Sequence, residues 1–158
     1  MAIYVKYGSI KGDATQDQHK QWINVSSVQF GLGRAIMTAT GAAKNREASE
    51  PSNSEITVTK ELDSSSHEIF KQAAVGTAGE DLKIEWVSTD QAGQTYLTVT
   101  CSEALISGYS VSSGGDRPSE SVSFNFTKME FKAAPLDENN EPSGPFTVTY
   151  DMKTGKAS

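Results

Sequence analysis

The chain has 158 residues, of which 36% are hydrophobic, so it is long enough for a single domain over residues 1–158 with one modest core. Twenty acidic residues against 14 basic ones give a formal net charge of −6, and no cluster of Lys and Arg occurs along the sequence. Nucleic-acid binding normally needs a basic face, so we expect no nucleic-acid partner. A membrane-spanning helix needs about 20 apolar residues, and no stretch of the sequence approaches that length, so we expect no membrane insertion.

Alternating apolar and polar residues mark seven runs, and this alternation is typical of half-buried β-strands. The runs are residues 3–7, 22–32, 56–62, 82–87, 95–109, 121–131 and 146–152. In two runs the apolar residues change from odd to even positions or back. These changes predict one β-bulge near Ser26 and Ser27 and another at Thr127 and Lys128.

One segment after the third run has a helical period instead. Ser65 and Glu68 have the spacing of a capping box, apolar residues recur one turn apart, and Gly76 follows as a stop. A short helix is therefore predicted at about residues 65–75. Seven to eight strands with one flanking helix predict a mainly β fold, a flattened antiparallel β-barrel or sandwich.

Two segments have no period. Residues 133–144 have the composition of a polar linker. Residues 33–54 form a long extended loop with a local cluster of Lys44, Arg46 and Glu47. Loops of this length in a compact domain are usually functional or disordered, so two interpretations stay open: an interaction arm, or a mobile loop without a role.

Little in the sequence supports catalysis. The two histidines, His19 and His67, show no metal-binding spacing, and no serine lies in a Gly-x-Ser-x-Gly turn. We therefore expect no enzyme activity, no metal and no cofactor, with a hydrolase on a β scaffold as a weaker alternative. Cys101 lies in a strand-like run, which favours a buried small hydrophobic residue over a reactive thiol.

The two ends of the sequence bear on localisation. The start, MAIYVKYGSIKGD, lacks a basic region followed by an apolar run, so we expect no Sec signal peptide. A cytoplasmic protein is predicted, whose export would need a route without a cleaved leader. The end, MKTGKAS, follows soon after the last run, and no C-terminal effector domain is expected.

A glycine-rich corner, SSGGDRP, joins the fifth and sixth runs into a long hairpin. Gly114 and Gly115 allow the chain to reverse, and Pro118 starts the returning strand. Asp116 and Arg117 at this tip either contact a neighbouring subunit or are solvated. The residues alone leave both alternatives open.

Four stretches occur in a characteristic order: IYVKYGSIKGD, HKQWINVSSVQFG, EITVTKELD and ISGYSVSSGGDRPSESVSFNFTKMEF. Together they resemble the haemolysin-coregulated protein (Hcp) family of bacterial type VI secretion systems. The resemblance runs from Ile3 to about Asp151, and the corner GGDRPSES is its most specific part.

The resemblance implies a structural subunit of the secretion tube. Family members form hexameric rings that stack into the inner tube, which a contracting sheath expels with the spike protein at its tip. The protein would then remain cytoplasmic until the system secretes it into the surroundings or a target cell. Some members carry and protect small effector proteins inside the ring. A phage-type tail tube protein, which shares this architecture, and a monomeric β-sandwich binding module are the alternatives.

A pore that passes varied cargo needs a polar, weakly charged wall. Strand positions opposite the apolar ones suit that role, whereas an ordinary solvent-facing strand would carry more Lys and Glu. The candidate pore-lining residues are Ser27, Gln29, Ser121, Ser123 and Asn125. With the resemblance, the extended loop becomes the ring-stacking contact, and its candidate residues are Arg34, Lys44, Arg46 and Glu47.

Overall fold

A computed structural model describes residues 1–38, 40–41, 46–90 and 93–158 of the protein. Lys44, one of the candidate stacking residues, lies outside the described residues. The described part contains helix α1 (Ser66–Val75) and a 3₁₀ turn at Asp17–His19. Its strands are β1 (Ala2–Tyr7), β2 (Ile23–Val25), β3 (Ser27–Gln29), β4 (Leu32–Gly33), β5 (Ile36–Thr38), β6 (Arg46–Ala48), β7 (Ser52–Asn53), β8 (Ile56–Glu61), β9 (Glu80–Val87), β10 (Thr95–Ser112), β11 (Ser119–Asn125), β12 (Lys128–Ala133), β13 (Phe146–Asp151) and β14 (Lys156–Ala157).

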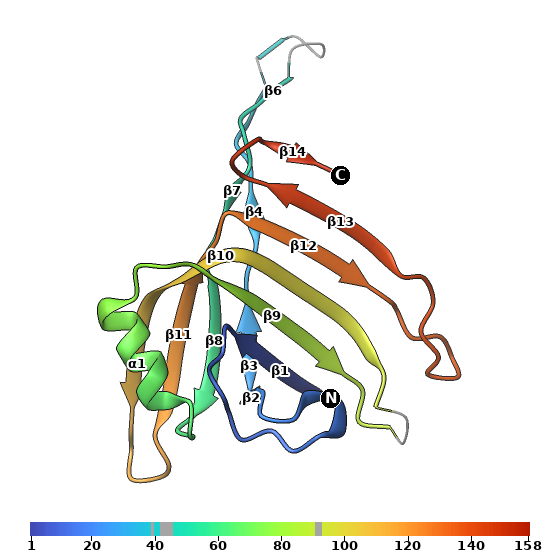
Figure 1. Ribbon diagram of the computed structural model, residues 1–158. Coiled ribbons are helices and arrows are strands. Elements are labelled where there is room, and N and C mark those ends of the chain that lie inside the picture. The colour runs from blue at the N-terminus through green and yellow to red at the C-terminus, as the bar shows by residue number, and fades with distance from the viewer. Residues whose placement is uncertain (39, 42–45, 91–92) are drawn as a thin grey trace.

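Strand β10 belongs to two sheets (Figure 1). Its first half pairs with β9 and β12 in a large sheet of order β2-β1-β9-β10-β12-β13-β14. Its second half pairs with β11 in a small sheet of order β10-β11-β8-β3. All these pairs are antiparallel and the sheets do not close on themselves. This arrangement confirms the predicted flattened β-barrel or sandwich with a flanking helix.

The core lies between the inner faces of the two sheets. Val5, Ile84 and Val99 line it from the large sheet, and Val58 and Phe124 line it from the small sheet. Cys101 is fully buried, as predicted, and burial raises the pKa of its thiol to about 12. A thiol in this state is not a nucleophile at neutral pH.

A register shift in β10 moves its second half by one residue. The shift lies between Cys101 and Ala104, where Glu103 has a positive φ of 53°, and it bends the strand from one sheet to the other. Uninterrupted alternation in the run 95–109 puts Leu105 on the same side as Leu97, Val99 and Cys101, and the shift makes that expectation wrong. Leu105 is partly exposed on the other face, and Ala104 is buried in its place.

The predicted bulges correspond to changes in strand pairing. At Ser26 the chain leaves β1 and joins β8, since both the Ser26 N–H and its hydroxyl donate to the Thr59 carbonyl oxygen. At Phe126 and Thr127 the pairing with β10 is interrupted, but β12 resumes it in the register that β11 left. The register shift between β10 and β11 lies on the other strand, between Ile106 and Gly108 of β10.

Helix α1 begins one residue later than predicted and ends where predicted. The capping box is wrong: the Ser65 side chain makes no cap hydrogen bond. The carboxylate of Asp63 instead accepts the Ser65 N–H at 2.9 Å, and Gly76 donates its N–H to the Gln72 carbonyl at the other end. Ile69 is the side chain that fixes the helix to the core.

The long loop has more regular structure than its sequence predicts. Two short antiparallel ladders, β4 with β7 and β5 with β6, make a narrow ribbon that projects from the body (Figure 1). We call this ribbon the arm. Ile36 and Met37 on the arm are exposed.

Candidate functional site: an uncharged polar sheet face

All five candidate pore residues lie on one face of the small sheet. Ser27 pairs with Thr59, which pairs with Ser121, which pairs with Ser110. The next row contains Gln29, Thr57, Ser123 and Gly108. Directly opposed residues of antiparallel strands share a face, so these rows form one surface. We call it the polar face: Ser27, Gln29, Thr57, Thr59, Ser110, Ser121, Ser123 and Asn125.

The polar face carries no formal charge, because all eight of these side chains are hydroxyls or amides. Glu61, next on the same side of β8, and Leu105, paired with Asn125, lie at its ends. Ser27, Gln29 and Asn125 are exposed, whereas Ser121 and Ser123 are half-buried. The hydroxyls of Thr57 and Ser123 lie 3.1 Å apart and share a hydrogen bond across the strands. The surface therefore offers both donors and acceptors to whatever lies against it.

The outer face of the large sheet differs, although its strands belong to the same fold. Lys6, Lys83 and Glu130 share one row of its outward side, and Glu85 and Lys132 share the next. That pattern is the mixed charge of an ordinary solvated sheet. The uncharged polar face of the small sheet is therefore a local feature and not a consequence of the overall composition.

The candidate stacking residues lie along the arm. Arg34 is exposed between β4 and β5, and Arg46 and Glu47 belong to β6, where their backbones pair with Thr38 and Met37. The structure thus places these three positions on one projecting ribbon.

The hairpin tip is exposed at Gly114, Gly115 and Asp116. Arg117 turns back to its own chain: its Nη2 and Nε donate to the Leu62 carbonyl oxygen at 2.7 and 3.0 Å, and its Nη1 lies 3.4 Å from the Glu61 carboxylate. The guanidinium therefore fixes the tip against the end of β8. Alternation in the run 56–62 puts Leu62 on the same side as the buried Ile56 and Val58, but Leu62 is exposed here.

A buried ion-pair cluster on the other face of the same strands was missed by the sequence analysis. Lys60 of β8 and Glu120 of β11 are 1% and 0% exposed and form a salt bridge. Lys60 Nζ also lies 2.9 Å from Asp63, and Ser66 of α1 donates to Glu120 at 2.9 Å. The cluster joins both strands to the first turn of the helix.

Tyr109 of β10 completes this cluster by donating its hydroxyl to Glu120. Burial first, and then this hydrogen bond to a carboxylate, raise the pKa of Tyr109 to about 12. The phenol therefore stays a donor at neutral pH. A signal existed for this site, because Lys60 and Glu120 continue the buried positions of Val58 and Val122.

Comparison with protein families gives one decisive match. The family model described as "Type VI secretion system effector, Hcp" matches residues 4–132, which is most of the chain. The chain belongs to the Hcp family.

Solved structures agree with this assignment. A structure described as a type six secretion system protein has a TM-score of 0.91 at 23% identity, with 99% of each chain covered. Hcp1 from Salmonella typhimurium has a TM-score of 0.79 at 21% identity, covering 99% of this chain and 98% of that one. A type VI secretion system effector from Yersinia pestis has a TM-score of 0.74 at 19% identity, covering 94% and 98%. At these identities the likeness shows the fold. A comparison with curated protein sequences found no match.

Hcp proteins are structural proteins of the type VI secretion system, and the family is not an enzyme family. In this Hcp-family chain, no helix of the described residues is long and apolar enough to cross a membrane. The same residues contain no group of three His, Cys, Asp or Glu side chains placed to hold a metal ion.

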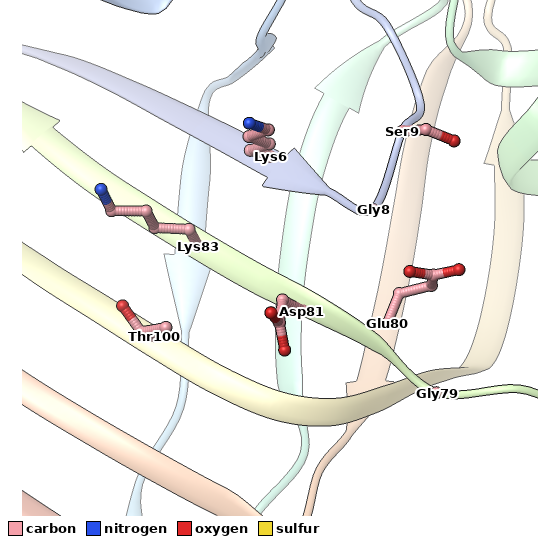
Figure 2. Close-up of a pocket in the computed structure, with 8 residues that line it drawn as sticks. All are labelled: Lys6, Gly8, Ser9, Gly79, Glu80, Asp81, Lys83 and Thr100. Atoms are coloured by element: carbon pink, nitrogen blue, oxygen red, sulfur yellow. The ribbon is translucent and has the colours of Figure 1, made fainter.

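A depression of about 800 Å³ lies on the outer side of the large sheet (Figure 2). Its charged side chains are Lys6, Lys83, Glu80 and Asp81, and Figure 2 shows Glu80 and Lys83 pointing away from one another. Lys83 is instead paired with Glu85 at 2.7 Å. The charged groups do not converge on a reacting atom, so this depression lacks the arrangement of an acid–base site.

Beside it, His19 holds the loop between β1 and β2 against the large sheet. The buried imidazole stacks on Tyr4 at 4.6 Å and contacts the Trp22 ring edge-on at 4.8 Å. Its two nitrogens bond the Gln16 side-chain oxygen and the Glu85 carboxylate. Trp22 begins the run 22–32, whose alternation puts it on the apolar face of a strand. Instead it precedes β2 and lies near the amines of Lys6 and Lys83.

Burial alone would raise the pKa of Glu85, but hydrogen bonds from Lys83 and His19 outweigh it and lower that pKa below its usual range. The carboxylate is thus ionised at neutral pH and accepts hydrogen bonds from Lys83 and His19. Its role in this chain is to anchor the loop.

Proposed function

We propose that this chain is a tube subunit of a type VI secretion system, with six copies closed into a ring and the polar face lining the central pore. The observation that supports this most strongly is the uncharged polar face itself. It extends over four strands of a protein whose other sheet carries charges of both signs.

The edges of the small sheet support ring closure. Among the described strands, β3 pairs only with β8, and residues 105–112 of β10 pair only with β11. The two open edges lie at opposite sides of one sheet, and unpaired backbone groups at an edge favour addition of another strand. Pairing of β3 in one copy with β10 in the next joins the small sheets into a continuous wall.

A wall of hydroxyls and amides suits a channel for protein cargo. Hydroxyls and amides form hydrogen bonds with water as readily as with a cargo protein, so the cargo is not bound tightly. Because the wall has no charge, it neither attracts nor repels cargo of a particular charge. Small effector proteins are therefore the proposed occupants of the pore.

The arm is the proposed contact between stacked rings, through Arg34, Lys44, Arg46 and Glu47. Each exposed ion pair contributes only about 0–1 kcal/mol, but six symmetric copies act together. The exposed tip at Gly114, Gly115 and Asp116, with Arg117 behind it, is a proposed contact between subunits. The spike protein and the sheath are the remaining proposed partners, and secretion is the proposed fate of the protein.

The native mass of the purified protein, measured by light scattering behind a sizing column, tests this function. A ring of six copies of 16.9 kDa has a mass of about 101 kDa. Electron microscopy of that fraction should then show rings with a central hole. A monomer under all ionic strengths tried contradicts the proposal and favours the monomeric binding module. A phage tail tube protein predicts the same ring, and loss of secretion in a sheath-deficient strain distinguishes the two.

A further inference from the structure

The large sheet extends beyond the core that it covers. One row of directly paired residues runs Val5, Ile84, Val99, Phe131 and Val148. Their exposed fractions are 1%, 0%, 0%, 39% and 55% along the row. The inner, apolar face thus continues onto β12 and β13, where the small sheet no longer covers it.

We call this uncovered surface the overhang: Phe131, Phe146 and Val148. Phe146 shares the face because it pairs with Ala133, which pairs with Leu97, and it is 64% exposed. Phe131 and Val148 also line an apolar groove of about 380 Å³ that separates β12 and β13 from the base of the arm at Phe30 and Leu32. Asn53 on that side has a buried side-chain oxygen without a hydrogen-bond partner among the described residues. An exposed apolar surface of this kind, with an unsatisfied acceptor at its margin, is typical of a protein interface.

A second apolar surface lies at the opposite side of the molecule. Phe70 and Val75 of α1 are 61% and 66% exposed. A shallow groove of about 280 Å³ runs between the helix and β10, lined by Phe70, Ala73, Ala74, Ser107, Gly108 and Tyr109. All of these side chains are uncharged, and the Phe70 ring packs edge-on against Tyr109 at 5.9 Å.

The two surfaces lie beyond opposite edges of the small sheet (Figure 1). The helix contacts β10 at one edge, and the overhang is next to Phe30, which follows β3 at the other edge. When β3 of one copy approaches β10 of the next, the overhang of the first copy comes over the helix of the second. A contact between two different surfaces of identical chains repeats from copy to copy, and it forms a ring when the rotation between copies closes.

Neither groove is lined by a charged side chain. Glu130 and Lys132 of β12 lie on the outward side of the large sheet, opposite the overhang. Near the helix, Asp63 is already paired with Lys60, and Glu61 with Arg117. Contact between the two surfaces therefore buries apolar side chains without burying these charges.

We infer that the overhang of each copy is covered by the exposed face of helix α1 in the next copy. This rests on the proposed ring and goes beyond it, since it assigns an apolar contact outside the pore wall. The apolar surface left open in the single chain is then part of the core of the assembly.

Site-directed cross-linking tests this contact. Cys101 is buried, so introduced cysteines are the reactive ones. Chains with Phe70→Cys and chains with Phe146→Cys are mixed, assembled and treated with a short bis-maleimide. We expect a covalent dimer in several-fold excess over that from either chain alone. Thr147→Cys, on the opposite face of β13, is the matched control and should cross-link weakly to Phe70→Cys.

Each other result contradicts the inference in a distinguishable way. Wild-type rings of the correct mass without the mixed cross-link overturn the contact and leave the proposed function standing. Cross-linking within the Phe146→Cys sample alone indicates a symmetric dimer, and cross-linking of Phe146→Cys to Met37→Cys shows that the arm occupies the overhang. A wild-type chain that stays monomeric overturns both proposals. If Phe146→Cys itself prevents ring formation, Val148→Cys replaces it.

Discussion

The polar face of the small sheet and the overhang of the large sheet are both open strand surfaces, yet their chemistry is opposite. Ser27, Gln29 and Asn125 are uncharged and polar, while Phe131, Phe146 and Val148 are apolar. Both sets follow the same alternation in sequence. The polar face can therefore remain exposed to water, whereas the overhang requires a protein partner.

The difference also separates two tasks that a tube subunit has to perform. A surface that contacts passing cargo must not hold it, so hydroxyls and amides suit it. A surface that contacts the same partner permanently is stabilised by apolar burial at about 25 cal/mol per Å². Substitutions that exchange these chemistries between the two surfaces should therefore have very unequal effects.

The largest effect is expected from a charge on the overhang. Phe146→Glu places a carboxylate where we propose an apolar contact, at a cost of several kcal/mol for each subunit contact. The ring should be lost, and light scattering should report a mass near that of one chain. Thr147→Glu, on the other side of the same strand, should keep the ring. If both variants gave the same native mass, the two faces of β13 would not differ as we propose.

The next effect concerns the side of β8 opposite the polar face. Lys60→Met leaves Glu120 buried without its cation, which should lower the free energy of unfolding by about 3–5 kcal/mol. Thr59→Met, one residue earlier and on the polar face, should change it by about 0.5 kcal/mol. Urea titration of the two variants measures this contrast. The double variant Lys60→Met/Glu120→Gln should recover part of the loss, and no recovery would show that the pair itself is not the cause.

A smaller effect is expected from a charge on the polar face. Gln29→Lys adds one lysine per copy to an exposed position, so the ring mass should stay unchanged and stability should change by about 0.5 kcal/mol. The result should appear in cargo: less of an acidic effector should pass, and more should co-purify with the ring. Loss of the ring by Gln29→Lys would mean that this surface, too, is a permanent contact.

The last effect is a pH dependence of stability, outside both surfaces and without consequence for the ring. Because the pKa of Glu85 is lower in the folded chain than its ordinary value of 4.5, its contribution to stability is present above that value and is lost as pH falls further. Glu85→Gln should cost about 1–2 kcal/mol at pH 7, and the difference from wild type should narrow below pH 4.5. Urea midpoints at pH 7 and pH 3.5 measure it. A constant difference would show that the carboxylate charge is not involved.

Alternation in the sequence was sufficient to predict the polar face, because the faces of a strand follow directly from residue parity. It placed Ser27 opposite Val28 and Ser123 opposite Phe124, and the structure then aligned them in rows. The rows themselves were not predictable. Register depends on which strands meet, and parity within one strand contains no information about its neighbours.

The overhang was not predictable for a related reason. Phe146 and Val148 have the same pattern as Val122 and Phe124, but only the latter are covered by their own chain. The cluster of Lys60 and Glu120 was not predicted either. In sequence, a charged residue at a buried strand position looks like an interruption of the apolar–polar alternation until its partner is known. Asp63 replaced the predicted cap since this carboxylate is already held by Lys60.

Strand β10 has a further consequence for how the protein is made. β1 can complete its pairing only when β9 is available. Neither sheet can be completed before β10, which comes late in the chain, has been synthesised. Pairings so distant in sequence are slow to form, because chain entropy is lost before contacts compensate for it. During synthesis the early strands therefore remain without their partners until Thr95–Ser112 has emerged from the ribosome. Newly made chains therefore expose unpaired strand edges, which are prone to aggregate, for longer than a helical protein of this size would.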